Sequence, residues 1–385
     1  MQEIAASPPI PLGSARHAMA AALGMVAATA RVAVGASFTE PVASRRVLIL
    51  EPYGLGDAIS LVPLAHGLLA SGWQVTVCSR PSWREVFPAE ISWVDCRVPW
   101  TAYDDRQKYR ASSIIGPAMR SFLHHLRRAA AGSVGIDTRG DARSLILLWL
   151  ARCQRVLTLD RYLGYDLANP KWVGERVAFD PSLRRWQSNL QFLTALEPAA
   201  DTRHFPLDLR GHWSATGGIS SDRPTVGLIP LAPWLGKLWT RDAWRTTVRL
   251  LQQDGWIVRG LAGPGQMDAT VASLGLDAQD VILCPDLPTW ARQLSGLSAV
   301  VSVDTGPMHL ADALHVPLVA LYGASTLPLW APSSPRSLAL HRQSDPDHRP
   351  VHPTGDAIPI GQQWMRRHSP EDVVAAVHRV CGSLT

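Results

Sequence analysis

The first half of the chain alternates short, continuous apolar runs with segments of helical character. Three runs predict strands that are buried on both faces of a sheet: 47–50, 74–78 and 134–137. Helices are predicted after them, at 57–69, 81–87 and 145–150. A glycine-containing loop at 51–56 connects the first strand to the first helix. This alternation predicts a doubly wound, mostly parallel sheet.

The same alternation starts again in the second half. Its predicted strands are 225–229, 256–261, 281–283, 299–303 and 318–321. Its predicted helices are 241–252, 290–297 and 308–314, with a final helix that begins at Ser369-Pro370 and continues to about Val380. The chain is therefore expected to be an α/β protein with two Rossmann-like domains that face a cleft.

Length and composition agree with two domains, because 385 residues exceed one ordinary core and 46% of them are hydrophobic. The expected boundaries are an Ala-rich extension at 1–44, a first domain at 45–205, a linker at 206–223, a second domain at 224–360 and a C-terminal helix at 361–385. The linker is rich in Gly, Ser, Thr and Asp, which favour loops. A polar stretch without period at 100–120 predicts one further loop.

Charge and cysteine content narrow the class of protein. The net charge of +5 suits an anionic ligand or an anionic surface, but Lys and Arg are scattered, so nucleic acid is not an expected partner. The five cysteines are odd in number and widely separated, which favours a reducing cytoplasm. The uncharged stretch 18–30 is shorter than the roughly 20 residues that span a bilayer. A signal peptide, a weakly amphipathic extension and a frayed helix are its alternative interpretations.

The turn Asp304-Thr305-Gly306 joins a buried strand to a helix. Backbone N–H groups and the helix dipole at such a turn attract phosphates. Asp304 is placed to accept hydrogen bonds from sugar hydroxyls, and Thr305 can donate to a phosphate oxygen. The alternative is that Asp304 and Thr305 only cap the helix.

Two further residues are candidates for chemistry. Asp57 follows Gly54-Leu55-Gly56 at a helix start, where it could act as a general base or as a helix cap. Ile59 stands where a dinucleotide fingerprint needs its third glycine, so a nicotinamide dehydrogenase is disfavoured. Lys237, in a loop after the first strand of the second half, could neutralise a departing diphosphate or be a surface lysine.

The order of these motifs from about Arg46 to Cys381 resembles glycosyltransferase family 9, the lipopolysaccharide heptosyltransferases. The stretch from Val301 to Gly323 is the most specific part. The other similar pieces are 54–57, 137–144, 189–196, the Lys237 loop and the helix start at 369–373. The resemblance implies a GT-B fold, with the acceptor on the N-terminal half, the donor on the C-terminal half and the final helix crossing back.

The resemblance also implies roles for single residues. Asp57 matches the catalytic base and Lys237 the phosphate-contacting lysine. The positions that match the donor site are Asp304, Thr305, Gly306, Met308 and His309, with Gly263 in the loop after the second strand. The positions on the acceptor side are Gly56, Arg139, Arg143 and Ser144. Where many relatives carry an acidic residue for the donor ribose, this chain has the loop 263–268, and its segment 345–363 is rich in Pro and His.

The expected activity is inverting transfer of a heptose or related sugar from a nucleotide diphosphate donor, ADP-heptose being favoured. The acceptor would be a hydroxyl of the lipopolysaccharide core or of another glycan or glycolipid. No metal and no cofactor is expected, because a helix N-terminus and a lysine can neutralise the leaving group. The expected location is the cytoplasm, with contact to the inner-membrane surface left open. The alternatives are a sugar-nucleotide epimerase and a catalytically silent binding or scaffold protein of envelope assembly.

Overall fold

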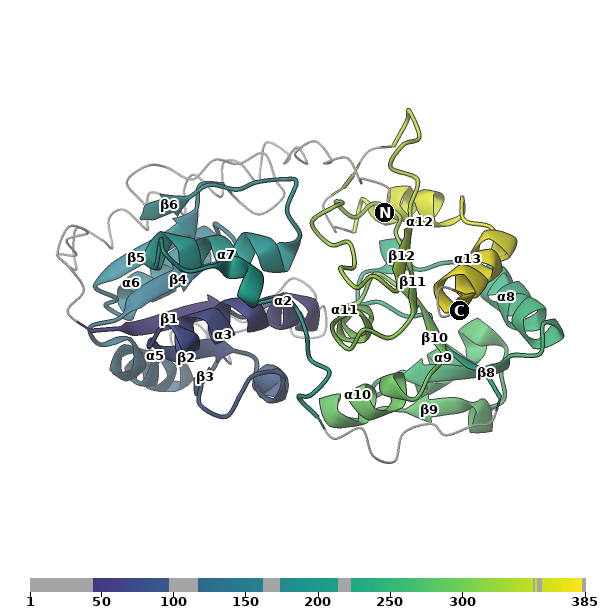
Figure 1. Ribbon diagram of the computed structural model, residues 1–385, viewed down its shortest axis with the longest axis horizontal. Coiled ribbons are helices and arrows are strands. Elements are labelled where there is room, and N and C mark those ends of the chain that lie inside the picture. Colours follow the sequence, from purple (N-terminus) through teal and green to yellow (C-terminus); the bar gives the residue numbers. More distant parts are fainter. Residues whose placement is uncertain are drawn as a thin grey trace. The chain divides into compact units, whose positions relative to one another are not determined.

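A computed structural model of the chain describes residues 44–96, 117–161, 174–213, 223–348, 350–351 and 355–382. The described residues form two compact units, one up to Pro206 and one from Leu207 onward (Figure 1). The predicted extension before Ser44, most of the polar loop at 100–120 and the end of the predicted linker lie outside the described residues.

The first domain is built on a parallel six-stranded sheet with the strand order β3-β2-β1-β4-β5-β6. Its strands are β1 (Arg46–Glu51), β2 (Gln74–Ser79), β3 (Ser92–Asp95), β4 (Val134–Asp137), β5 (Arg155–Leu159) and β6 (Glu175–Val177). Its helices are α2 (Leu55–Ser60), α3 (Val62–Ala70), α5 (Pro117–Ala130), α6 (Ala142–Leu150) and α7 (Arg185–Leu196), with the 3₁₀ turns η1 (Pro81–Val86) and η2 (Thr202–His204).

The second domain repeats this topology with the order β12-β11-β10-β7-β8-β9, again parallel. Its strands are β7 (Thr225–Ile229), β8 (Ile257–Ala262), β9 (Val281–Leu283), β10 (Ala299–Val303), β11 (Leu318–Leu321) and β12 (Ser337–Leu340). Its helices are α8 (Arg241–Gln253), α9 (Met267–Leu274), α10 (Leu287–Ser295), α11 (Gly306–Ala313), α12 (Ile358–Met365) and α13 (Pro370–Gly382), with the 3₁₀ turns η3 (Leu235–Lys237) and η4 (Ala278–Asp280).

Both sheets have the doubly wound order in which the first and fourth strands lie side by side. The chain reverses its direction of travel across the sheet at β1 and β4 in the first domain, and at β7 and β10 in the second. Loops that leave the carboxyl ends of two such strands diverge, and ligands of open α/β sheets bind there. The predicted α/β class with two Rossmann-like domains is confirmed, and these two strand pairs are the places to look for function.

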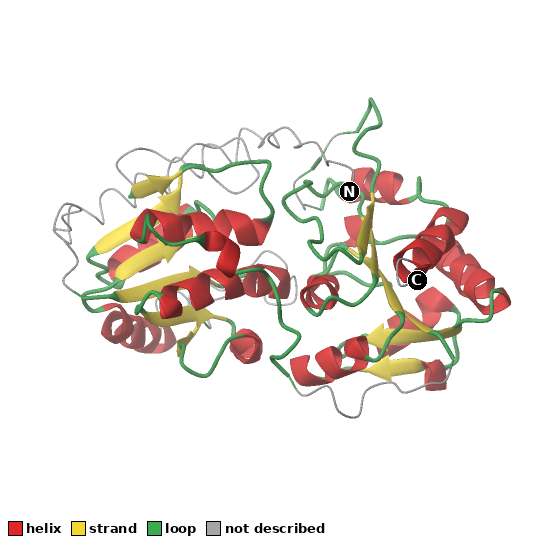
Figure 2. Ribbon diagram, in the orientation of Figure 1, coloured by secondary structure: helices red, strands yellow, loops and turns green. Residues whose placement is uncertain are grey.

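The cores explain why the central strands were recognisable in the sequence. All residues of β7, β10 and β11 are buried, because helices such as α8 and α13 cover the sheet (Figure 2). In the first domain α5 and α6 pack with β1 and β4 in the same way. Edge strands lack this double cover: every residue of β12 is only partly buried. The strands β3, β5, β6 and β12 were not predicted, nor were α5, α7, α9 and α12.

The predicted helix 57–69 was wrong in two respects. It begins at Leu55, so that Asp57 lies in the first turn instead of at the cap, which is Gly54. It also divides into α2 and α3, since Pro63 has no N–H with which to continue the helical hydrogen bonds. Asp57 is thereby held in the first turn of a short helix.

The C-terminal helix was predicted correctly at its start, where the Ser369 hydroxyl accepts a hydrogen bond from the backbone N–H of Asp372, 3.1 Å away. Helix α13 packs against α8 and against the strands β10, β11 and β12 of its own domain. The predicted linker begins inside that domain too: Leu209 is buried, and its N–H donates to the carbonyl of Ala313 over 2.8 Å.

Candidate functional site

Two buried carboxyl groups close the neighbouring strands β1 and β4 of the first domain. Glu51 is the last residue of β1, Asp137 is the last residue of β4, and Asp137 pairs in register with Leu50. Neither side chain is exposed to solvent. The Thr138 hydroxyl donates to Glu51 Oε2 over 2.7 Å, and the Thr158 hydroxyl donates to Asp137 Oδ2 over 2.8 Å. Acidic groups therefore gather where the chain reverses across the sheet.

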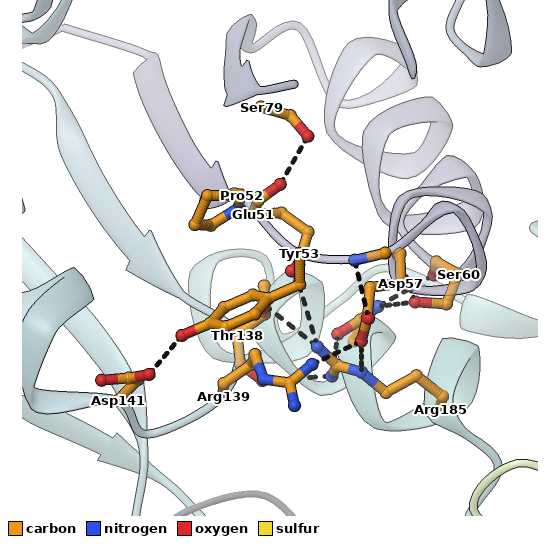
Figure 3. A network of polar contacts seen from close by, with 12 residues as sticks. Glu51, Pro52, Tyr53, Asp57, Ser60, Ser79, Thr138, Arg139, Asp141 and Arg185 are labelled. Carbon is orange, nitrogen blue, oxygen red and sulfur yellow. Dashed lines mark hydrogen bonds and ion pairs between the residues drawn. The ribbon is translucent and has the colours of Figure 1, made fainter. Parts of the chain in front are cut away.

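Asp57 lies at this point, in contact with a guanidinium group. Its Oδ1 accepts a hydrogen bond from Arg139 Nη1 over 2.7 Å, and its Oδ2 accepts one from the Gly54 N–H over 3.2 Å (Figure 3). Arg139 in turn lies over the ring of Tyr53, with its Cζ 4.0 Å from the ring centroid. The predicted base and the predicted acceptor residue Arg139 are thus direct partners.

Tyr53 connects this pair to Asp141 and Arg143. The Tyr53 hydroxyl donates to Asp141, and Arg143 donates to both carboxylate oxygens of Asp141, with Nη2 2.5 Å from Oδ2. Burial opposes the ionisation of Asp141, but the charge and hydrogen bonds of Arg143 outweigh it and lower the pKa of that carboxyl. Arg143 remains partly exposed, so it joins the buried network to the surface.

Glu51 and Asp137 behave differently from Asp141. Burial, and then the negative charge of Asp57, raise the pKa of Glu51 to about 7, although Arg185 and Arg139 oppose this. Burial, and then the charge of Asp141, raise the pKa of Asp137 to about 7 as well. Near neutral pH these two carboxyls are therefore poised to hold or release a proton.

In the second domain, Lys237 and Asp304 form the corresponding pair. Lys237 Nζ lies 2.6 Å from Asp304 Oδ2, which also accepts a hydrogen bond from Ser325 Oγ over 2.5 Å. His309 Nε2 lies 3.6 Å from Asp304 Oδ1. Burial opposes the ionisation of Asp304, but the charge of Lys237 and the contact with His309 hold the pKa of this carboxyl well below its usual range. Lys237 is a partner in an ion pair, and the prediction that it lies by the strand ends is confirmed.

The turn that begins α11 has fewer free hydrogen-bond donors for a phosphate than its sequence suggested. Thr305 occupies the N-cap position without a hydrogen bond from its side chain to the helix, so its hydroxyl is not the predicted cap. The N–H groups of Met308 and His309 point to the Thr305 carbonyl, at 3.1 and 3.4 Å. Pro307 has no N–H. Gly306, at the first helical position, and the Thr305 hydroxyl are what this turn offers to a ligand.

Two other residues that were predicted for the sugar-donor site, Met308 and Gly263, already make contacts inside the protein. The side chain of Met308 is fully buried, and the Tyr322 hydroxyl lies 3.7 Å from its sulfur. The N–H of Gly263 donates to Gln266 Oε1 over 3.0 Å. Met308 therefore supports the turn from the core, and the side chain of Gln266 closes the loop at Gly263.

The structure groups the predicted site residues by domain. In the first domain Gly56 immediately precedes Asp57, Asp57 contacts Arg139, and Arg143 reaches the same network through Asp141. Ser144 is fully buried in α6, and its hydroxyl has no hydrogen-bond partner among the described residues. In the second domain Lys237, Asp304 and His309 form one cluster. The two catalytic candidates, Asp57 and Lys237, come from different domains.

Several residues of the network were not predicted: Glu51, Tyr53, Asp141, Arg185 and Ser325. Glu51 carried a recognisable signal, since an acid that directly ends an apolar run is what marked Asp304. Arg185 carried no such signal, because no local sequence pattern predicts that a single arginine will contact a residue as distant in the chain as Glu51. Its ion pair with Glu51, 3.1 Å from Nη2 to Oε2, exists only through the packing of α7.

The two domains use the same topology with opposite signs of charge. In the first domain the acid, Asp57, follows the first strand and the cation, Arg139, follows the fourth. In the second domain the cation, Lys237, follows the first strand and the acid, Asp304, follows the fourth. Each ion pair therefore links the two loops that diverge where the strand order reverses.

Across the described ranges, His, Cys, Asp and Glu form no group of three or more that could hold a metal ion. The five cysteines, all of them in the described part of the chain, are free thiols. No helix in the described part of the chain is both long enough and apolar enough to cross a bilayer.

The raised pKa values of Glu51 and Asp137 predict how stability depends on pH. Between about pH 4.5 and 7 the folded chain binds more protons than the unfolded chain, whose carboxyls titrate near their ordinary values of 4.5 and 3.8. The free energy of unfolding contributed by each group should therefore fall as pH rises through this window, by about 1 kcal/mol per pH unit. Urea unfolding of wild type, Glu51→Gln and Asp137→Asn measures it. Each replacement should flatten the fall, and an unchanged slope would contradict the assignment.

The chain is similar to known proteins in both sequence and fold. A search of curated proteins finds lipopolysaccharide heptosyltransferase 1 of Pseudomonas aeruginosa, 37% identical over 93 residues, which are 23% of this chain and 26% of that protein. The match thus spans about a quarter of this relative. Among solved structures, Escherichia coli heptosyltransferase WaaC with ADP has a TM-score of 0.62 at 16% identity, covering 87% of this chain and 99% of WaaC.

A second solved structure, Escherichia coli ADP-heptose lipopolysaccharide heptosyltransferase II, has a TM-score of 0.59 at 18% identity, covering 88% of this chain and 99% of its own. These likenesses show the fold, which is of the GT-B type. The family model for glycosyltransferase family 9 (heptosyltransferase) matches residues 119–354, more than half of the chain. With its two parallel-sheet domains and this match, the chain belongs to glycosyltransferase family 9.

Proposed function

We propose that the chain is an inverting glycosyltransferase that moves a heptose from ADP-heptose to a hydroxyl of the lipopolysaccharide core or of a related glycan. The observation that carries the proposal is the occurrence of a charged pair where the strand order reverses in each domain. Asp57 with Arg139 supplies an acid and a cation in one domain, and Lys237 with Asp304 supplies them in the other. An enzyme that joins an activated sugar to a hydroxyl needs a base for the hydroxyl and a cation for the leaving group.

The donor is assigned to the second domain. Lys237 is a cation at the strand ends, Gly306 begins α11, and the Thr305 hydroxyl is not used as a cap. A lysine and a helix N-terminus together form a good site for a diphosphate. Two solved structures of this fold support the proposed class of donor, since one holds ADP and the other is named for ADP-heptose.

The reaction is a single displacement at the anomeric carbon. The acceptor oxygen forms a bond to this carbon while the bond from the carbon to the diphosphate oxygen breaks. The hydroxyl proton passes to Asp57, and the bonding electron pair leaves with ADP. Lys237 and the N-terminus of α11 stabilise the charge that develops on the diphosphate, so the reaction needs no metal.

The acceptor is assigned to the first domain. Arg143 is partly exposed and Arg139 lies beside Asp57, so two guanidinium groups border the proposed base. Guanidinium groups bind carboxylates and phosphates through paired hydrogen bonds. An anionic glycan or glycolipid is the acceptor class that fits. Since the chain has a pI near 9.1, we extend the proposal to a cytoplasmic enzyme that works at the anionic surface of the inner membrane.

The position of Lys237 depends on a close contact between two glycines. A Cβ added to Gly361 in α12 would lie 2.5 Å from the carbonyl oxygen of Gly236 and 2.9 Å from its carbonyl carbon. Gly236 belongs to η3, the turn that ends with Lys237. The Gln362 side chain also donates to the Leu235 carbonyl over 3.3 Å. Helix α12 therefore holds the backbone that presents the lysine.

Asp57→Ala should abolish transfer, because the variant lacks the proposed proton acceptor. We expect a loss of about 100-fold or more in kcat, with ADP-heptose affinity within a few-fold of wild type. ADP release in the presence of core acceptors measures the first quantity, and calorimetry measures the second. Asp242→Ala, at an exposed acid in α8, is the control. Near-normal transfer by Asp57→Ala would remove the residue from this role.

Lys237→Ala should slow transfer and weaken the binding of ADP. The loss of this cation leaves the diphosphate with the helix N-terminus alone, and it leaves Asp304 buried without its closest counter-charge. Calorimetric titration with ADP and steady-state kinetics test both effects. Wild-type values for both would show that Lys237 does not touch the donor.

Gly361→Ala should lower kcat through Lys237 without touching the substrate. The new methyl group meets the backbone of Gly236, so η3 has to move. We expect weaker ADP binding and slower transfer, in the same direction as for Lys237→Ala but smaller. Gly355→Ala is the matched control, because a Cβ at Gly355 meets nothing within 4 Å. Equal kinetics for the two glycine variants would contradict the positioning role of α12.

The nucleotide sugar and the acceptor used in these assays also distinguish the proposed transfer from the alternative functions. An epimerase on this scaffold would convert the nucleotide sugar without any acceptor, which chromatography of the donor after incubation detects. A binding or scaffold protein would bind the donor and release no ADP. Transfer that requires an acceptor and releases ADP in equal amount supports the proposed function against both.

A further inference from the structure

A fully buried ion pair lies beside the proposed base. Glu51, at the end of β1, accepts a hydrogen bond on Oε2 from Arg185 Nη2, 3.1 Å away, and a second on the same oxygen from Thr138. The side chains of Glu51 and Arg185 are 0% and 3% exposed. Burying two charges is costly unless their geometry is good, so the pair calls for an explanation beyond stability.

Arg185 is held away from Asp57 by its other contacts. Its Nη1 donates to Asn189 Oδ1 over 2.6 Å and to the Thr138 carbonyl over 3.1 Å. Its Nε forms only a long ion pair with Asp57 Oδ1, at 3.7 Å, which is too far for a hydrogen bond (Figure 3). This buried N–H has no hydrogen-bond partner among the described residues. A guanidinium group therefore stops just short of the carboxylate of the base.

The same helix also anchors the element that carries Asp57. Asn189, one turn along α7 from Arg185, donates to the carbonyl of Ser60 over 2.9 Å and to its hydroxyl over 3.0 Å. The Ser60 hydroxyl donates in turn to the carbonyl of Asp57 over 2.6 Å. Helix α7 thus fixes both the backbone at Asp57 and the cation beside it.

We propose that Glu51 is a positioning residue that tethers Arg185 and keeps it from closing onto Asp57. Without the tether, Arg185 would complete a short ion pair with Asp57 and occupy the oxygen that already accepts from Arg139. The acceptor hydroxyl would then compete for Asp57 with two guanidinium groups at short distance instead of one. With the tether, Arg185 keeps Glu51 as a counter-ion of its own when Asp57 takes up the proton.

The inference rests on the proposed function and adds a pH dependence to it. The groups that face Glu51 are Asp57 from α2, Thr138 and Arg139 after β4, Arg185 from α7 and, more distantly, Asp137. Ionised Glu51 tethers Arg185 most strongly, and a proton on this carboxyl weakens the tether. Since burial and Asp57 raise the pKa of Glu51 to about 7, kcat should rise with pH through the neutral range.

The test compares Glu51→Gln, Arg185→Met and the double variant Glu51→Gln/Arg185→Met in the acceptor-dependent transfer assay. Glu51→Gln should lower kcat about 10- to 100-fold, leave KM for ADP-heptose unchanged and remove the rise of kcat near pH 7. The double variant should recover part of this loss, because Arg185 is no longer present to close onto Asp57. A role in folding alone predicts losses that add or compound.

The controls separate failure of this inference from failure of the function. Glu175→Gln breaks an outer ion pair of the same sheet, with Arg155 at 2.6 Å, and should leave kcat unchanged. Urea unfolding checks that the first domain of each variant is folded, and ADP binding checks the second domain, to which the donor is assigned. If the wild-type chain transfers the sugar, either of two results overturns the inference alone. One is a Glu51→Gln variant whose pH profile of kcat matches that of wild type, and the other is a double variant slower than both single variants. Absence of transfer by the wild-type chain overturns the proposed function and the inference together.

Discussion

A carboxylate that folding removes from water must acquire a cation or keep its proton, and both candidate sites of this chain are organised by that requirement. Asp304 meets it with Lys237, and Asp57 meets it with Arg139. Each of these pairs joins a segment after the first strand of a domain to a segment after the fourth. The ion pairs therefore hold in place the two loops that the topology drives apart.

The reversal of strand order explains why charge can exist at these points in otherwise apolar cores. The strands themselves are covered on both faces, and the first polar residues after them are still largely buried. At the carboxyl ends of adjacent strands, loops leave toward opposite sides and a polar group finds space without disturbing the packing below. The domains then differ in the sign of the charge that follows the first strand, which is the acid Asp57 in the first domain and the cation Lys237 in the second.

The buried cluster at the strand ends of the first domain brings together more carboxyl groups than arginines. Among the described residues, Arg143 pairs with Asp141, Arg139 with Asp57 and Arg185 with Glu51, which leaves Asp137 with hydrogen bonds but no ion pair. Burial is the main cause that raises the pKa values of Glu51 and Asp137 to about 7, and the negative charge of a neighbouring carboxylate adds to each shift. A site that shares its cations among several carboxyls is sensitive to the loss or gain of a single proton.

The sequence by itself determined the fold class, the central strands of both sheets and the candidates Asp57, Lys237 and Asp304. These follow from local signals: continuous apolar runs, glycine turns and acids at strand ends. It missed the partly buried edge strand β12, whose apolar run of three residues is short, and the inner strand β5, whose apolar run is interrupted by Thr158. It also assigned the start of the first helix to the wrong residue. Only the tertiary structure decided which charges meet. Arg185 is 134 positions from Glu51 in the chain, and a contact over that separation depends on how α7 packs, which no local pattern encodes.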